Sequence, residues 1–445
     1  MKNILSKLKF KILSRLFKFF FYLKFDFIAS LILCISIKKY NIINKKNNKT
    51  NILFFFKTAG IDDLKTTFTK FDNHKFNFYY LPRKYFRIIY DYYLGYTNLH
   101  DYDYKIEKND HKKSLAGYNL RITNYIKIIN KLYNFKCFIS FNPFYRSDRE
   151  IQKICSKFNI KFIALHKEGV GSPVEDKILR YLYKNKIEKF NGDYISVYSE
   201  NEKDLMMSSK FAKNSQVEVV GSPRCDLSYD LRKIKPQNNT ILYYMIERDR
   251  GIPWYFFSNY NNKNKNKILN EIGINRSVLT ANWDELAKKT LIYCLHYARR
   301  NKEIKLIIKG KQSAHTNKDL PKKLPENVVY IQDGAGHHLL RNAKTVIAFN
   351  TTAVLEAMLA NRNIIIPYFG NKNLSKKKNF VINFNNKKYA VYSKHEFFRK
   401  LNLFLKKKYA FKKMSYLEKK ILNKFVGNSD GKSSFRLFNF LTKKI

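Results

Sequence analysis

The sequence has few acidic residues and no closely spaced pair of cysteines. Its 445 residues include 86 lysines and arginines but only 35 aspartates and glutamates, a formal net charge of +51. The five cysteines are scattered without a C-x-x-C pair: Cys34, Cys137, Cys155, Cys225 and Cys294. This pattern excludes a zinc ribbon, argues against a disulfide framework and fits a reducing cytoplasm.

A hydrophobic run long enough to span a bilayer is also missing. The longest uncharged apolar run, residues 27–37, is far shorter than the roughly 20 residues that a transmembrane helix needs. A cleaved signal peptide is disfavoured by the aromatic residues and interleaved lysines, and no A-x-A site follows.

The N-terminal region instead has an amphipathic helical pattern. Four basic residues fall on one helical stripe: Lys7, Lys11, Arg15 and Lys18. Six apolar residues cover the opposite side: Leu8, Ile12, Leu16, Phe19, Phe20 and Leu23. We therefore expect residues 1–47 to form a basic, amphipathic helical extension that lies in the plane of an anionic membrane. The alternative is a helix packed on the core, with its lysines facing solvent.

The net charge does not by itself indicate nucleic-acid binding. Lys, Asn, Ile, Phe and Tyr are all abundant together, as drift toward AT-rich codons would produce. The aromatic residues fall mostly in apolar strands and helices, and no RRM, KH or helix-turn-helix signature is present. The charge permits anionic membranes and phosphates as partners, and we expect no nucleic acid.

Apolar runs of strand length alternate with helical patterns along most of the chain. Predicted strands occupy residues 51–56, 136–140, 161–165, 194–198, 217–220, 305–309, 346–349 and 364–366, with another beginning near residue 240. This alternation is typical of α/β proteins with parallel sheets covered by helices. No fixed-period repeat is evident.

The segment from Val346 to Tyr368 reads as strand, small polar turn, short helix and strand. Three polar residues stand where an N-cap belongs, Asn350, Thr351 and Thr352, and Glu356 follows in the second turn. Such a unit directs backbone N–H groups and hydroxyls to the carboxyl edge of a sheet, where phosphate-bearing ligands bind. Taken alone, it could equally be an ordinary crossover with a well-made cap.

Three further loops follow predicted strands. In His166-Lys167-Glu168-Gly169, Glu168 is a candidate general base and His166 is the competing one. The alternative is an acidic residue that simply leads into the next helix.

The other two loops carry cations. Arg224, in Gly221-Ser222-Pro223-Arg224, could clamp a phosphate, or could pair with Asp226 in an interdomain turn. Lys309 and Lys311 flank a glycine at a strand end and suit a diphosphate, although single lysines mean little in so basic a chain.

These motifs, with Gly427-Asn428-Ser429-Asp430-Gly431-Lys432 near the end, resemble bacterial surface-carbohydrate (capsule or lipopolysaccharide) biosynthesis proteins. They are also similar to CDP-glycerol glycerophosphotransferases and polysialyltransferases. The resemblance covers roughly residues 51–445 and implies a GT-B-like fold, two Rossmann-like domains facing across a cleft. The expected domains are residues 48–230 for the acceptor, residues 231–426 for the nucleotide, and a helix at 427–445 that returns to the first domain.

The resemblance also implies roles for particular residues. The acidic-acidic-Gly motif that supplies the base in polysialyltransferase-like relatives corresponds to Lys167-Glu168-Gly169, so only Glu168 carries over. Their Ser/Thr motif at the nucleotide phosphate corresponds to Thr351-Thr352. Their His-Pro motif is not matched, since this loop has Lys311 and, further on, His315, and the donor nucleotide is therefore open.

No metal site or cofactor is expected. Asp101-Tyr102-Asp103 mimics a D-x-D motif, but it lies in a Tyr-rich polar stretch with no apolar strand before it. GT-B enzymes generally neutralise donor phosphates with lysine, arginine and helix N-termini instead of a metal.

The sequence thus predicts a glycosyltransferase that moves a sugar or polyol phosphate from a nucleotide-activated donor to a growing surface polysaccharide. The acceptor would be a glycan or glycolipid, and the protein would lie on the inner face of the cytoplasmic membrane. The alternatives are a nucleotide-sugar isomerase similar to UDP-GlcNAc 2-epimerases and, less favoured, a basic nucleic-acid-binding protein.

Overall fold

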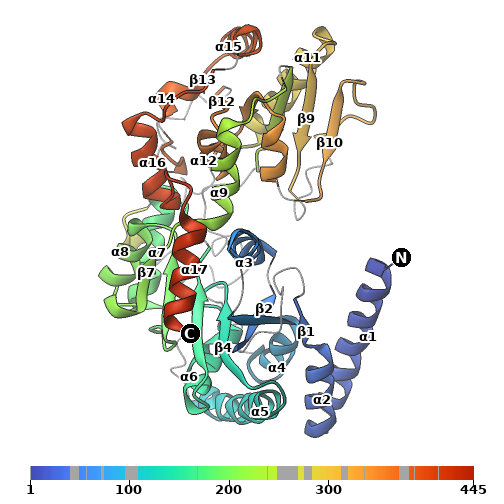
Figure 1. Cartoon of the computed structure of the whole chain (residues 1–445), viewed down its shortest axis with the longest axis vertical. Helices are drawn as coiled ribbons and strands as arrows, with labels where there is room; N and C mark the ends of the chain where they lie inside the picture. The colour runs from blue at the N-terminus through green and yellow to red at the C-terminus, as the bar shows by residue number, and fades with distance from the viewer. Residues whose placement is uncertain are drawn as a thin grey trace. The chain divides into compact units, whose positions relative to one another are not determined.

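The computed structural model describes residues 2–40, 50–56, 58–71, 75–95, 109–167, 169–237, 239–247, 269–274, 283–311, 319–334, 336–369, 380–384, 386–408 and 410–445. The chain divides into two compact units (Figure 1). The first comprises Met1–Gly169, Arg180–Pro223 and Ser434–Ile445, and the second comprises Val170–Leu179 and Arg224–Ser433.

The first unit is built on a seven-stranded sheet in the order β1-β3-β2-β4-β5-β6-β7. Its strands are β1 (Lys38–Lys39), β2 (Thr50–Phe56), β3 (Phe76–Pro82), β4 (Phe135–Ser140), β5 (Lys161–Leu165), β6 (Tyr194–Val197) and β7 (Val217–Val219). All neighbours run parallel except β1, which pairs antiparallel with β3. The apolar runs of β2, β4 and β5 form these strands because both faces of a parallel sheet are covered by helices.

Helices connect these strands. They are α3 (Thr58–Lys70), α4 (Lys84–Leu94), α5 (Asn109–Tyr133), α6 (Arg149–Lys157), α7 (Pro173–Asn185) and α8 (Glu200–Ser208). The part of α7 up to Leu179 is grouped with the second unit. The C-terminal helix α17 (Ser433–Lys444) also belongs to this unit. Its Leu437, Phe440 and Leu441 are buried in one cluster with Ile52 and Phe54 of β2, so the last residues of the chain complete the core of the first unit.

The N-terminal region forms two helices, α1 (Lys2–Tyr22) and α2 (Asp26–Ser36), and both belong to the first unit. They are separated by a turn in which Lys24 has a φ of 62°. The ring of Phe17 packs edge-on against Tyr85 of α4, with 5.1 Å between ring centroids. Asp26 forms an ion pair with Arg121 of α5. One face of the expected extension is therefore packed on the unit, as in the alternative weighed from the sequence.

The second unit contains a six-stranded parallel sheet in the order β10-β9-β8-β11-β12-β13. Its strands are β8 (Thr240–Tyr244), β9 (Lys305–Lys309), β10 (Val328–Ile331), β11 (Thr345–Ile347), β12 (Asn363–Pro367) and β13 (Ala390–Val391). Numbered from β8, this order is 3-2-1-4-5-6, which is the Rossmann order. The predicted α/β class, with two Rossmann-like parallel sheets, is confirmed.

The helices of the second unit are α9 (Pro223–Asp230), α11 (Asp284–Arg300), α12 (Ala353–Leu359), α14 (Asn386–Tyr389), α15 (Lys394–Lys406) and α16 (Tyr416–Val426). Asp226 of α9 is fully buried and accepts hydrogen bonds from the Asn428 side chain (2.5 Å) and the Ser433 backbone (3.2 Å). Gly431 has a φ of 70°, and a Cβ there would lie 2.5 Å from the ring of Tyr229. These contacts join the Arg224 loop to the glycine-rich motif near the end of the chain.

Candidate functional site

A cavity of about 370 Å³ opens at the carboxyl ends of β8, β9 and β11, within the second unit. Its lining residues are Tyr244, Met245, Glu247, Lys309, Gly310, Lys311, Gly334, Gly336, Phe349, Thr351 and Thr352. β9 pairs with β8 on one side, and β11 pairs with β8 on the other side. The strand order therefore reverses between β8 and β11. Open α/β sheets bind ligands in the crevice at such a switch point.

The two lysines of the cavity have different environments. Lys309 is buried, and its ammonium donates to the carbonyl oxygens of Gly310 (2.8 Å) and Gln332 (2.7 Å). Burial lowers the pKa of Lys309. Lys311 is 55% exposed, and its Nζ lies 2.7 Å from Oε1 of Glu247. Lys309 therefore fixes the loop after β9, and Lys311 is the lysine that a ligand can reach.

The polar turn after β11 supplies hydroxyls to the cavity. Asn350 is buried with a φ of 53°, and its amide donates to Phe380 O (2.8 Å) and accepts from Ile382 N (2.7 Å). Asn350 thus anchors the segment around residue 381, whereas Thr351 and Thr352 line the cavity. Thr352 holds the N-cap position in helical geometry, but within the described chain its hydroxyl makes no capping hydrogen bond. The sequence placed the cap at Asn350-Thr351-Thr352 as a group, and of these the Thr351 hydroxyl accepts from the Ala353 backbone N–H at 3.5 Å.

Arg224 and Glu356 are two further site residues expected from the sequence, and the Arg224 charge acts electrostatically on the Glu356 carboxyl. Neither is among the described residues that line the cavity. Burial raises the pKa of Glu356 to about 6, against the opposing effect of the Arg224 charge. Asp226, the alternative partner for Arg224 in the sequence, accepts hydrogen bonds from Asn428 and Ser433.

The raised pKa of Glu356 predicts a pH-dependent cost to stability. A carboxyl whose folded pKa exceeds its unfolded value binds more protons when folded, so the cost develops as the pH rises from about 4.5 through 6. Glu356→Gln should therefore stabilise the protein at pH 8 by about 1–2 kcal/mol and have little effect at pH 4. Urea unfolding at both pH values measures this. Glu326→Gln, an exposed carboxyl in the same unit, is the control, and equal effects of the two variants would contradict the assignment.

In the first unit, His166 lies at the carboxyl end of β5 next to a carboxylate. His166 is 4% exposed, and its backbone N–H donates to Ser196 O (2.8 Å). Its Nε2 lies 3.5 Å from Oε1 of Glu202, which is equally buried on α8. The other Glu202 oxygen accepts from the Tyr198 backbone N–H at 2.7 Å. The loop thus places the imidazole of His166 beside a carboxylate on α8 whose position is fixed.

The position of Glu202 is fixed by its surroundings. Ser199 caps α8 by accepting from the Glu202 backbone N–H. A Cβ at Gly169 would lie 2.2 Å from the Glu202 carboxyl carbon, so a side chain at that position would displace the carboxylate. Sequence reasoning missed Glu202, although the S-x-x-E spacing from Ser199 after a predicted strand is a capping signal.

Two single residues and one motif considered from the sequence lie outside the described part of the chain. Glu168, the candidate base two residues after His166, is one of them. The others are His315 and the Asp101-Tyr102-Asp103 motif. Among the residues that the structure describes, no group of three or more His, Cys, Asp or Glu side chains could hold a metal ion.

Comparisons with known proteins give distant structural likenesses. No protein-family model and no curated protein matches the chain. Among solved structures, the wall teichoic acid polymerase TagF (H548A variant) is similar at 10% identity, with 97% of each chain covered and a TM-score of 0.48. Arabidopsis thaliana UGT89C1 complexed with UDP has 10% identity, covering 88% of this chain and 99% of that one, with a TM-score of 0.45. UDP-N-acetylglucosamine 2-epimerase from Rickettsia bellii has 9% identity, covering 90% and 97%, with a TM-score of 0.44.

Proposed function

We propose that the protein is a GT-B glycosyltransferase that moves a sugar or polyol phosphate from a nucleotide-activated donor to a growing surface polysaccharide. The cavity at the switch point of the second sheet carries this proposal, because lysine and threonine side chains converge there on an open space. The acceptor would be a glycan or glycolipid at the inner face of the cytoplasmic membrane.

In this proposal the cavity holds the phosphates of the donor. Lys311 supplies the mobile positive charge, because its ammonium can turn from Glu247 to a phosphate oxygen. Thr351 and Thr352 offer hydroxyl donors at the same edge. Lys309 supports the loop. Arg224 would contribute its positive charge, which already acts on the buried Glu356 carboxyl. Together, these charges and hydroxyls would stabilise the negative charge on the nucleotide phosphate as it leaves.

The first unit would supply the general base. The acceptor hydroxyl must lose a proton as it attacks the donor, and the loop after β5 carries His166 and Glu168. We propose that His166 accepts the proton of the acceptor hydroxyl, because Glu202 is placed to stabilise the imidazolium that forms. Glu168 is the competing base, as the sequence motif suggests.

A screen of nucleotides tests the donor site. A nucleotide at about 100 times its Kd should stabilise the native protein by about 2.7 kcal/mol, which corresponds to a rise in Tm of about 5–10 °C. CMP, CDP, UDP and GDP would be compared by thermal unfolding, with and without EDTA. We expect one base to be preferred, the diphosphate to bind more tightly than the monophosphate, and EDTA to have no effect.

Lys311→Ala should abolish most of this stabilisation, because it removes the accessible charge of the cavity. Lys305→Ala removes an exposed lysine from the other end of the same strand and should leave the shift unchanged. If both variants lost the nucleotide-induced stabilisation equally, the nucleotide would be responding to the overall positive charge of the protein and not to the cavity. Conversion of UDP-GlcNAc to its epimer without any acceptor would replace the transferase proposal with the isomerase.

A further inference from the structure

The helix α1 has two apolar faces, and only one of them is packed. Phe17 and Phe21 are buried against the first unit, with exposed fractions of 0% and 2%. On another face four apolar side chains of the helix are exposed, Leu8, Ile12, Leu16 and Phe19, and the exposed Leu23 follows directly after its end. They follow one another at spacings of four, four, three and four residues, so they form a continuous stripe along the helix.

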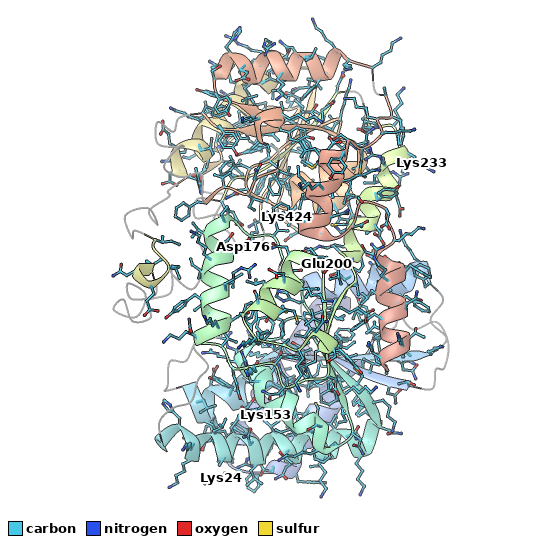
Figure 2. The ribbon with its side chains drawn as sticks, turned by 90° about the vertical axis from the view of Figure 1, so that its left-hand side faces the viewer. Lys24, Lys153, Asp176, Glu200, Lys233 and Lys424 are labelled. Carbon is cyan, nitrogen blue, oxygen red and sulfur yellow. The ribbon has the colours of Figure 1, made fainter. Side chains whose placement is uncertain are left out.

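The neighbouring helix α2 repeats this arrangement. Ala29 and Leu33 are fully buried, whereas Phe27, Leu31 and Ile35 form an exposed stripe at four-residue intervals. Phe27 is 69% exposed and Ile35 is 58% exposed. The two helices pack against each other, and Lys24 lies in the turn that joins them (Figure 2).

This concentration of exposed apolar side chains is unusual within the chain. Of the 22 large hydrophobic side chains that are exposed among the described residues, 11 fall between Leu8 and Ile35. Single exposed hydrophobic residues are ordinary on protein surfaces, but a contiguous set marks an interaction surface. We call the exposed stripes of α1 and α2 the helical-pair surface.

Positive charge borders the helical-pair surface. Exposed basic side chains lie on α1 and in the turn that follows it: Lys9, Lys11, Arg15, Lys18 and Lys24. Lys39, in β1 after α2, is also exposed. Asp26 is the sole acidic residue of the first 40, and it is paired with Arg121. An apolar stripe bordered by lysines matches the boundary between acyl chains and anionic headgroups.

We propose that the helical-pair surface docks on an anionic lipid bilayer, with α1 and α2 both lying in the membrane plane. This inference deepens the membrane location proposed above and rests on it. Within the described chain no helix is long and apolar enough to cross a bilayer. A second copy of the chain is a poor occupant, because symmetric pairing of this surface would bring like charges together.

The test measures binding of the full-length protein to vesicles by co-sedimentation. Vesicles of phosphatidylglycerol and phosphatidylcholine should bind the protein, and vesicles of phosphatidylcholine alone should bind it far more weakly. Phe27→Ser/Leu31→Ser/Ile35→Ser should weaken binding about 10–100-fold, because three inserted side chains are lost. Lys11→Gln/Arg15→Gln/Lys18→Gln should weaken it by a similar factor on anionic vesicles only.

Matched controls come from the second unit. Ile292→Ser/Leu403→Ser/Leu417→Ser removes three exposed apolar side chains, and Lys406→Gln/Lys407→Gln/Lys408→Gln removes three exposed charges. Both should bind vesicles like the unaltered protein. Equal losses in controls and test variants, or unaltered binding in both test variants, would overturn the proposal. The proposal would also be overturned if the protein were a dimer and Phe27→Ser/Leu31→Ser/Ile35→Ser made it a monomer without changing its binding to lipid.

A nucleotide-stabilisation measurement on each variant separates this proposal from the transferase. Variants that lose vesicle binding but keep the nucleotide shift support the helical-pair surface, even if the transferase proposal fails on other grounds. Loss of both properties together would point to misfolding. The single variant Phe27→Ser then repeats the test with the least disturbance, and normal vesicle binding by that folded variant would count against the proposal.

Discussion

Replacing His166 with glutamine is expected to lower the turnover of transfer by about 10²–10⁴-fold, the usual contribution of a positioned general base. Nucleotide affinity should stay nearly unchanged, because His166 belongs to the first unit and the donor cavity to the second. Steady-state kinetics with the preferred donor, together with the nucleotide thermal shift, would measure both quantities. The physical reason is that glutamine fills the space beside Glu202 but takes up no proton.

Three other carboxylates provide the comparison variants. Glu202→Gln should keep the hydrogen bond from Tyr198 and remove the charge, lowering kcat with little change in KM. Glu200→Gln changes an exposed carboxylate on the same helix (Figure 2) and should have no effect. Glu168→Gln should stay active. If Glu168→Gln is inactive while His166→Gln retains its activity, the base is Glu168 and our assignment is wrong.

Replacing Phe440 with alanine should destabilise the first unit by about 3–5 kcal/mol, the usual cost of removing a buried phenylalanine. Phe440 is 1% exposed and belongs to the core cluster that contains Ile52 and Phe54. Urea unfolding followed by far-UV circular dichroism would measure the loss. Phe435→Ala, on the same helix at 47% exposure, is the control and should cost far less.

The two tryptophans make this experiment specific to one unit. Trp254 and Trp283 both fall in the residue range of the second unit. Their fluorescence should therefore report an unfolding transition that Phe440→Ala leaves almost unchanged. A shift of both transitions by the same amount would show that the units unfold together. A shift of the fluorescence transition alone would contradict the placement of α17 in the first core.

The positions of strands along the chain could be predicted from the sequence better than the order of those strands in the sheet. Apolar runs such as residues 51–56 and 305–309 were recognised as strands because buried parallel strands are continuously apolar. Strand order is different, because it depends on contacts between distant segments. The pairing of β8 with both β9 and β11 creates the switch point, and no local pattern shows it.

The candidate site was predictable to a similar extent. The loops carrying His166, Lys311 and Thr351 follow strands, so their positions at sheet edges could be inferred. Which side chains reach the cavity could not, because this depends on partners far along the chain. Lys309 is held by Gln332, and Asn350 by residues 380 and 382.

The contribution of α17 to the first core bears on the order in which the chain can fold during synthesis. Ile52 and Phe54 emerge early, whereas their partners Leu437 and Phe440 follow almost 400 residues later. The second unit has all its residues by Ser433, so it can complete its core first. Until α17 emerges, the nascent first unit exposes apolar surface, and in a cell that surface is a target for chaperones.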